Sequence, residues 1–458
     1  MIDYKKYHPV RGLSLFGRTI LRILRFLYWC RKILGRPQWE SPIPDHHENP
    51  LKMNATEKLF LGYKYYYKAI VKPEPGSGLA EHFANQTLAL SVPGNFVAHS
   101  TLTIGTGGDL MPYKNVHPTY CRELWAEAGP FLFENDIVFA NLETVADPSQ
   151  KYSAVPEIML HDMYFNVGED SFSVFSGNGQ YKGYDVLSTA NNHSLDMGEA
   201  GVLATLEFLG SKNIAWCGTS RSEAERDDFP IIERNGIRIA FLAYTFCLNK
   251  ESNPPGKEWL SNHILLNEPT PDISLIIHHA ALARNKGADL VVAALHMGCA
   301  YQAYPSVHTV TNMHAICREA NIDIALGGHP HNLQPMEIFE SLQPGSTSPK
   351  QHFIVYSLAD FIAYDIFKWC HLTMILQLTV SKGELDGKPH ALLTGIKAKP
   401  FYMYMDGQGN LRLLDFLRVM DQPEKHFSDK ATINEVRELA DFFQSFIITK
   451  KQEHILAG

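Results

Sequence analysis

Apolar runs of strand length recur between residues 100 and 365, and longer segments with helical periodicity separate them. The apolar runs lie at 102–106, 136–140, 185–190, 237–244, 289–295, 322–326 and 353–357. The helical segments lie near 118–128, 198–211, 274–286 and 308–320. Continuous apolar runs are typical of strands buried on both faces, and their alternation with helices is typical of α/β domains. We therefore predict an α/β fold that binds ligands beyond the carboxyl ends of its strands.

The pattern changes on both sides of this region. Residues 37–50 are rich in proline and predict a linker, whereas residues 55–72 have helical periodicity. Toward the C-terminus, 371–381 and 391–404 predict strands, 406–410 a turn and 428–450 a helix. We predict four parts: a basic helix over 1–36, a linker and lead-in helix over 37–99, a main domain over 100–380, and strands and a helix over 381–458 packed on it.

Basic side chains in residues 11–36 fall along one line of a predicted amphipathic helix. At 100° per residue their spacing keeps them within about 40° of each other. They are Arg11, Arg18, Arg22, Arg25, Lys32 and Arg36. This pattern is typical of a helix that lies on an anionic membrane, and the alternative is a helix packed on the protein's own surface. A membrane-spanning helix is disfavoured, because three arginines within the apolar stretch would cost about 8–10 kcal/mol.

Charge is distributed unevenly along the 458 residues. The formal net charge is −8; residues 1–36 contain nine basic residues and one acidic residue (+8), which leaves −16 for residues 37–458. This balance argues against nucleic acid as a partner, and no nucleic-acid-binding motif is present. The seven cysteines include no CxxC pair, which favours a reducing compartment. Together with the lack of a signal-peptide pattern, this favours the cytoplasmic side of a membrane, with the extracellular side as the alternative.

Residues that can bind a metal ion follow five of the predicted strands. Each loop alone has an ordinary alternative, such as a turn, a surface glutamate, a helix cap or a structural histidine, but five in the same structural position predict a metal site along one sheet edge. The candidates, in chain order, are Asp109, Glu143, Asn192 with its neighbour His193, His296, and the pair His329 and His331. A mixed carboxylate, amide and imidazole set without cysteine suits manganese, iron or zinc, and is too rich in histidine for a dedicated calcium site.

The order of these motifs resembles a known family. The sequence contains GD-L-M, NLE, ANNH-x-LD-x-G, H-x-G, GG-HPH-x-x-QP and YSL-x-x-F, all within residues 100–365. The combination is similar to the CapA family of capsule (poly-γ-glutamate) synthesis proteins, a branch of the calcineurin-like metallophosphatase superfamily. The resemblance implies an α/β fold built as a four-layer α/β/β/α sandwich, with two divalent metal ions at one edge of the sheets.

The resemblance also implies roles for individual residues. Asp109 and His331 would hold one metal ion. Asn192, His296 and His329 would hold the other, and Glu143 would bridge the two. His193 would act as the acid or the transition-state stabiliser. The residues expected to contact substrate are Asn191, Tyr301 and Gln334.

The chain departs from the family pattern at three places. Met111 stands where the superfamily has a histidine, as in the CapA branch, and weakens the expected first metal site. Ala300 stands just after the H-x-G motif, where CapA-like chains often have a glutamate. Ala359 and Asp360 replace the usual Gly-Asn of the YSL motif. These changes affect the expected substrate contacts, and with them the reaction, more than the fold.

Three functions are compatible with this sequence. Two divalent cations against Asp109 and Glu143 leave a site near +2, which favours an anionic substrate. The first function is a CapA-like dinuclear hydrolase acting on a γ-glutamyl or phosphoester bond in capsule or poly-γ-glutamate synthesis. The second is a non-catalytic factor at the membrane that binds a polyanion or assembles with a polymer synthase. The third is a general metallophosphoesterase acting on nucleotides or phospholipids.

Overall fold

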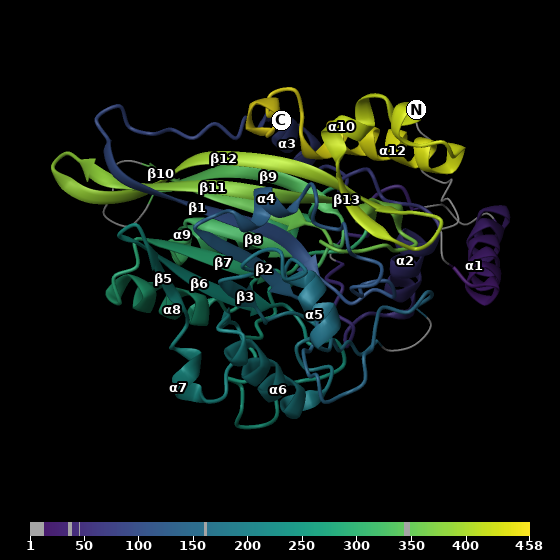
Figure 1. Ribbon diagram of the computed structural model, residues 1–458, viewed down its shortest axis with the longest axis horizontal. Helices are drawn as coiled ribbons and strands as arrows, with labels where there is room; N and C mark the ends of the chain where they lie inside the picture. The colour runs from purple at the N-terminus through teal and green to yellow at the C-terminus, as the bar shows by residue number, and fades with distance from the viewer. Residues whose placement is uncertain (1–12, 35–38, 45, 160–162, 343–348) are drawn as a thin grey trace.

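Two β-sheets form the centre of the computed structural model, which describes the chain except residues 1–12, 35–38, 45, 160–162 and 343–348 (Figure 1). The first sheet has seven described strands in the order β13-β12-β11-β1-β2-β3-β4. They are β1 (Val97–Leu110), β2 (Ile137–Leu142), β3 (Val186–Ser188), β4 (Ala215–Cys217), β11 (Leu372–Leu385), β12 (Lys388–Met405) and β13 (Leu411–Asp415). From β1 to β4 neighbouring strands are parallel, whereas β11, β12 and β13 add antiparallel pairs.

The second sheet has six described strands in the order β5-β6-β7-β8-β10-β9. They are β5 (Ile231–Arg234), β6 (Ile237–Thr245), β7 (Leu290–His296), β8 (Ile324–Gly328), β9 (Leu333–Leu342) and β10 (Pro349–Leu358). Its four central strands are parallel, and β5 and β9 form antiparallel edges. The two sheets pack face to face: the ring of Phe139 on β2 stacks on that of Phe241 on β6, with centroids 5.3 Å apart.

Helices cover the outer faces of both sheets. On the six-stranded sheet, α8 (Ser274–Asn285) packs on β6 and β7, and α9 (Val307–Glu319) packs on β8 and β9. On the other sheet, α4 (Gly129–Phe133) packs on β1 and β11, α6 (Gly198–Ser211) on β4, and α10 (Phe416–Asp421) on β12. These four layers confirm the predicted α/β/β/α sandwich.

The central strands are buried because their sequences are apolar throughout. Every residue of β2, β7 and β8 is buried, as expected for parallel strands covered on both faces. The carboxyl ends of neighbouring parallel strands lie at the same edge of a sheet. Residues at or just beyond the carboxyl ends of β1, β2, β3, β7 and β8 are therefore brought together, which is the arrangement that the five candidate loops need.

Several predicted elements differ from the structure. Residues 118–128 form turns, with bonds such as Leu124 N–H to the carbonyl of Cys121, and α4 begins only at Gly129. Trp125 accounts for part of this difference, because its fully buried indole N–H donates to the carbonyl of Val174 at 2.7 Å. Tertiary packing thus outweighs local periodicity there. The helix predicted over 55–72 is shorter, as α2 (Ala55–Tyr66).

The ends of the described chain pack on this core. The helix predicted over 428–450 divides into α12 (Lys430–Phe442) and a π-helical turn (Phe443–Ile447). At the other end, α1 (Leu15–Ile33) lies at one extremity of the molecule beside α2 (Figure 1). Among the described helices, none is both long and apolar enough to cross a membrane. The remaining described α-helices are α3 (Leu79–Asn85), α5 (Glu169–Phe175), α7 (Glu223–Arg226) and α11 (Pro423–His426).

Candidate metal centre

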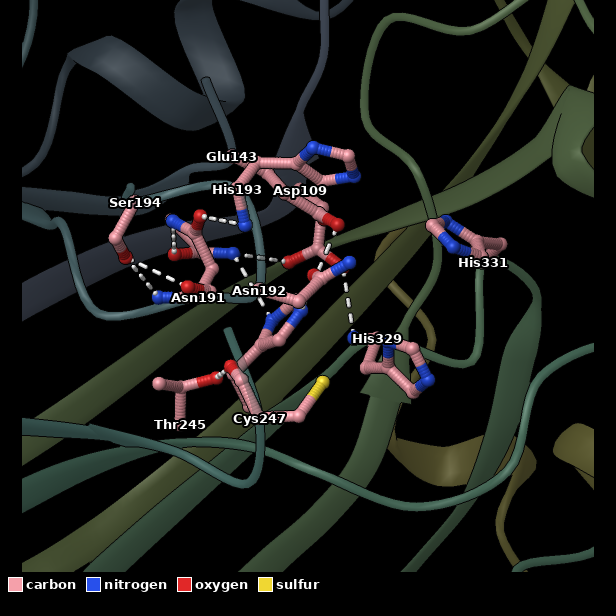
Figure 2. A network of polar contacts seen from close by, with 12 residues as sticks. Asp109, Glu143, Asn191, Asn192, His193, Ser194, Thr245, Cys247, His329 and His331 are labelled. Atoms are coloured by element: carbon pink, nitrogen blue, oxygen red, sulfur yellow. Dashed lines mark hydrogen bonds and ion pairs between the residues drawn. The ribbon is translucent and has the colours of Figure 1, made fainter. Parts of the chain in front are cut away.

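The five predicted loops meet at one place between the two sheets. Asp109 lies near the end of β1, Glu143 follows β2, His296 ends β7, and His329 follows β8. Ligand atoms of Asp109, Glu143 and His296 all lie within 4.8 Å of one another. Figure 2 shows Asp109 and Glu143 gathered with Asn192 and His329, and with His331 beside them. The structure thus brings together the six residues predicted as metal ligands.

Asp109 is fixed by bonds from both sheets. Its Oδ1 accepts a hydrogen bond from Asn141 Nδ2 at 2.8 Å, and its Oδ2 accepts one from the backbone N–H of His329 at 2.9 Å. Gly328 permits this approach, since a Cβ on it would lie 2.6 Å from Asp109 Oδ1. Gly108 is needed for a similar reason, because its Cβ would lie 1.8 Å from the carbonyl oxygen of Ala359. The two glycines allow the strand ends to converge on one point.

Glu143 carries a buried carboxylate that no described residue satisfies. The residue is fully buried, and neither carboxylate oxygen accepts a hydrogen bond. Burial, and next the neighbouring Asp109 carboxylate, raise the pKa of Glu143 well above its usual range. Burial likewise raises the pKa of Asp109 to about 6. Two adjacent buried carboxylates of this kind are stabilised by a cation between them.

The histidines of the site are suited to bind that cation. Burial lowers the pKa of His296 and His329 well below the usual range, so both imidazoles are neutral, which is the form that binds metal. Neither ring nitrogen of His329 has a hydrogen-bond partner among the described residues. His296 Nε2 lies 2.7 Å from Oδ1 of Asn192 and 3.5 Å from Oε1 of Glu143. The donor set fits a divalent metal ion.

The second histidine of the His-Pro-His loop is held in a different way. His331 Nδ1 lies 2.8 Å from Oδ1 of Asp360, and its ring stacks on Tyr301. Although burial lowers the pKa of His331, the charge of Asp360 raises it above the usual value. His329 and His331 also have positive φ angles of 94° and 62°. Such backbone strain in residues other than glycine is concentrated at functional sites.

His193 lies beside the centre as part of a histidine–carboxylate pair. Its Nδ1 lies 2.7 Å from Asp196 Oδ2, and its ring stacks on Phe165 with centroids 4.0 Å apart. Its backbone N–H donates to the side chain of Asn191 at 3.1 Å. These contacts fix the orientation of the ring. Because Asp196 accepts a hydrogen bond from Nδ1, Nε2 is the ring atom able to transfer a proton.

The residues predicted to contact substrate are engaged inside the protein. The Asn191 amide donates to the carbonyl of Leu142 at 2.7 Å, and the Gln334 amide donates to the carbonyl of Gln302 at 3.1 Å. Both are buried. Tyr301 is also buried, but it lies next to the centre through its stacking on His331. Substrate contact by these three residues stays a prediction.

Sequence reasoning did not assign four residues that support the site. Asn141, Asp196 and Asp360 hold Asp109, His193 and His331, as described above. Each of these three residues lies within one of the sequence motifs of the site. Their positions in those motifs could therefore have indicated a supporting role. Glu48 comes from the N-terminal region: its Oε2 accepts a bond from the backbone N–H of Ala300 at 2.6 Å. No signal in the sequence linked Glu48 to that loop.

Comparisons with known proteins identify the family to which the chain belongs. The fold and the site define a two-sheet α/β protein with a candidate metal centre at the carboxyl ends of its strands. The family model described as "Bacterial capsule synthesis protein PGA_cap" matches residues 103–365, more than half of the chain. The chain therefore belongs to this family of bacterial capsule synthesis proteins, which confirms the resemblance to the CapA family.

The individual relatives have low sequence identity to this chain. The chain is 25% identical over 330 residues to the capsule biosynthesis protein CapA of Bacillus anthracis, covering 68% of this chain and 73% of that protein. It is 27% identical over 239 residues to the PGA biosynthesis protein CapA of Bacillus subtilis (strain 168), covering 51% and 54%. Among solved structures, the calcineurin-like phosphoesterase YfkN from Bacillus subtilis is 12% identical with a TM-score of 0.34, covering 74% of this chain and 99% of that one.

Proposed function

We propose that this protein is a metal-dependent hydrolase that acts on an anionic substrate in the synthesis of bacterial capsule or poly-γ-glutamate. The observation that carries the proposal is the pair of buried carboxylates, Asp109 and Glu143, beside the neutral imidazoles of the centre. Neither carboxylate oxygen of Glu143 accepts a hydrogen bond from a described residue. Burying such carboxylates destabilises the fold, and destabilising groups of this kind are concentrated at functional sites.

The proposed centre holds two divalent ions of manganese, iron or zinc. Asp109 and His331 would hold one ion. Asn192, His296 and His329 would hold the other, and Glu143 would contribute to both. When bound, such ions supply positive charge and Lewis acidity to a polarised substrate oxygen. With +4 from the ions and −2 from the carboxylates, the site has an excess charge near +2 and therefore attracts an anion.

The chain's own residues then orient the substrate and move a proton. In its imidazolium form, His193 would donate the Nε2 proton to the leaving group and become neutral, while Asp196 accepts the hydrogen bond from the Nδ1 proton that stays on the ring. General acid catalysis of this kind contributes about 10²–10⁴-fold to a rate. Asp360 fixes the orientation of His331 in the same way that outer carboxylates fix metal-binding histidines. The names of the relatives, capsule and PGA biosynthesis proteins, support a polymer or its γ-glutamyl bonds as substrate.

A second candidate function is a non-catalytic factor that binds a polyanion or a polymer synthase at the membrane. The observation that favours it is the burial of the centre: none of the six predicted ligands is more than 9% exposed. A hydrolase must admit substrate to this point. His329 and His331, 8% and 9% exposed, mark the side from which a substrate would enter.

Metal analysis and a hydrolysis panel test these proposals. The purified protein should bind up to two Mn, Fe or Zn ions per chain, and His329→Ala with His331→Ala should lower that number. With manganese added, poly-γ-glutamate and phosphodiesters are assayed side by side; cleavage of phosphodiesters alone would favour a general metallophosphoesterase. His193→Ala should abolish hydrolysis and retain metal. Metal binding without cleavage of any substrate in the wild-type protein would favour the assembly factor.

A further inference from the structure

A second cluster of metal-binding side chains lies outside the centre described above. It consists of His82 on α3, His314 on α9 and Glu337 on β9, whose ligand atoms all lie within 4.8 Å of one another. His314 and Glu337 come from elements close in the sequence, whereas α3 belongs to the lead-in segment before β1, more than 200 residues away (Figure 1). The cluster shares no residue with the candidate metal centre.

Both histidines direct the same ring nitrogen at one carboxylate. His82 Nε2 lies 2.6 Å from Oε2 of Glu337, and His314 Nε2 lies 2.5 Å from Oε1. The Glu337 side chain is 1% exposed, whereas those of His82 and His314 are 36% and 21% exposed. The carboxylate thus forms the buried floor of the cluster, and the two imidazoles form a rim that an ion can reach from solvent.

Neighbouring groups hold the three side chains in this arrangement. The Tyr356 hydroxyl donates to Oε1 of Glu337, and the Gln86 amide lies 3.5 Å from Oε2. The ring of His314 stacks on Phe339 with centroids 4.0 Å apart, and that of His82 packs edge-on against Phe83. Supporting contacts of this kind orient ligands in metal sites, because they restrict each ring before the ion arrives.

We propose that His82, His314 and Glu337 bind one Zn²⁺ ion through the two Nε2 atoms and the carboxylate. Two imidazoles and one carboxylate form a known zinc donor set, in which the fourth position stays open. An ion about 2.0–2.1 Å from each ligand atom needs those atoms roughly 3.3 Å apart. The present contacts of 2.6 and 2.5 Å are shorter than this, so the partly exposed rings of His82 and His314 would both shift outward when an ion binds.

The position of the cluster indicates what the ion does. β9 is an edge strand of the six-stranded sheet, and α3 lies against it. A zinc ion held by α3, α9 and β9 therefore joins the lead-in segment to the sheet and covers its edge. We expect bound zinc to stabilise this corner of the molecule by linkage, since the site is assembled only in the folded chain.

Zinc titration of the full chain tests the proposal. The starting protein carries Glu143→Gln and His329→Ala, so that the candidate metal centre is weakened, and Zn²⁺ alone is titrated calorimetrically and by thermal melting. We expect one Zn²⁺ per chain and a rise in Tm. Adding His314→Ala should weaken zinc binding at least 10-fold and abolish the rise in Tm. The control is His278→Ala in place of His314→Ala. His278 is half-exposed and lies 3.3 Å from Asp227, and its loss should change neither the zinc affinity nor the rise in Tm.

A second variant protects the test against misfolding. Glu337→Gln keeps the size of the buried side chain and should also weaken zinc binding at least 10-fold while retaining a cooperative melt. Co²⁺ in place of Zn²⁺ should give the intense visible absorption of a four-coordinate site, and Glu337→Gln should remove it. Equal zinc affinity in the starting protein and in both cluster variants would overturn the proposal and identify the cluster as a histidine–carboxylate ion pair.

Discussion

Glu143 illustrates, at the scale of a single residue, how a functional group can oppose the stability of its own fold. Its carboxylate has lost its hydration, accepts no hydrogen bond from a described residue and lies against a second buried carboxylate. An unsatisfied buried polar group costs about 1–3 kcal/mol, and a charged one costs more. The raised pKa of Glu143 favours protonation, which reduces this cost in the metal-free protein, and a bound cation would remove it.

We therefore predict opposite effects of Glu143→Gln on stability and on metal binding. In the presence of a chelator, the neutral amide should raise Tm by roughly 1–4 °C, because the repulsion from Asp109 is removed. Metal affinity should fall at least 10-fold, because the proposed bridging ligand is weakened. Calorimetric melting and metal titration measure the two effects.

A matched control distinguishes this mechanism from a general effect of the substitution. Glu340→Gln, on the edge strand β9, neutralises a carboxylate that accepts a bond from Gln351 outside the centre. Glu340→Gln should leave both the Tm and the metal affinity nearly unchanged. A lower Tm of the chelated Glu143→Gln protein would contradict this mechanism, since it would mean that the carboxylate stabilises the metal-free fold.

The sequence identifies the ligands of the centre better than their surroundings. Asp109, Glu143, His296 and the His-Pro-His loop could be predicted because each directly follows an apolar run. The bonds that orient them could not, because they depend on which strands become neighbours. Asn141 is the example: it lies at the end of β2, two residues before Glu143, yet it donates to Asp109 on the neighbouring strand at 2.8 Å.

At the scale of single elements, α1 combines an exposed apolar surface with basic residues. Leu15, Phe16, Phe26 and Leu27 are each more than half exposed. Arg18 and Arg22 are exposed as well, whereas Leu21 is buried against the protein. Of the predicted basic line, Arg11 and Arg36 lie outside the described residues. We propose that this helix rests on an anionic membrane surface, with the buried side holding it to the protein.

Vesicle binding by the full chain tests the role of α1. We expect the protein to float with vesicles containing anionic phospholipid and to bind neutral vesicles weakly. Arg18→Glu with Arg22→Glu should weaken anionic binding at least 10-fold, since each basic residue near such a surface contributes about 1 kcal/mol. Lys425→Glu with Lys430→Glu, exposed residues at the other end of the chain, provides the same change in charge. An equal loss of vesicle binding in both double variants would count against α1 as the part of the protein that contacts the membrane.

The helix α2 supplies a second element-scale feature, a buried ion pair beside the metal centre. Lys64 Nζ lies 3.0 Å from Oε1 of Glu48, and both side chains are nearly fully buried. Glu48 also accepts the bond from the backbone of Ala300, in the loop that follows β7. The pair therefore joins the N-terminal region to a loop next to the candidate ligand His296.

Removing one member of this pair should destabilise the protein strongly. We predict that Lys64→Met lowers the free energy of unfolding by about 3–5 kcal/mol, because it leaves the Glu48 carboxylate buried without its cation. Lys64→Met combined with Glu48→Gln should recover part of the loss. Denaturant unfolding of the two single variants and the double variant gives the interaction energy; strictly additive losses would contradict a direct pairing.

At the scale of the whole molecule, the centre exists only because two sheets meet. Asp109, Glu143 and Asn192 come from the seven-stranded sheet, and His296, His329 and His331 from the six-stranded one. The parallel strands could be predicted from their apolar runs, but local sequence does not specify the assignment of strands to sheets. Strand β11 shows why: although it follows β10 in the chain, it pairs with β1 in the other sheet.

The C-terminal part is tied to this core by a titratable pair, which makes overall stability depend on pH. His371, at the end of a 3₁₀ turn (Lys368–His371), has Nδ1 2.6 Å from Glu435 on α12 and Nε2 2.8 Å from the carbonyl of Asp365. Burial lowers the pKa of His371, but Glu435 and this carbonyl raise it above the ordinary 6.5. Burial raises the pKa of Glu435, but His371 and Tyr402 hold it below the ordinary 4.5.

The two pKa changes define the pH range over which the pair stabilises the folded protein. Because the folded pKa of His371 is raised, its contribution is complete below about pH 6.5 and is lost as pH rises through the folded value. Because the folded pKa of Glu435 is lowered, its contribution is complete above about pH 4.5 and is lost as pH falls through the folded value. The pair therefore stabilises the folded protein most between these two limits.

We predict that His371→Gln removes the part of the pH dependence that lies above pH 6.5. In wild-type protein with chelator present, the free energy of unfolding should decline from pH 6 to pH 9, and the variant should show a flatter profile and lower stability at pH 6. His390→Gln, a histidine exposed on β12, should retain the wild-type slope. Urea unfolding across this range measures the profiles, and parallel slopes for His371→Gln and wild type would show that the pair does not carry the pH dependence.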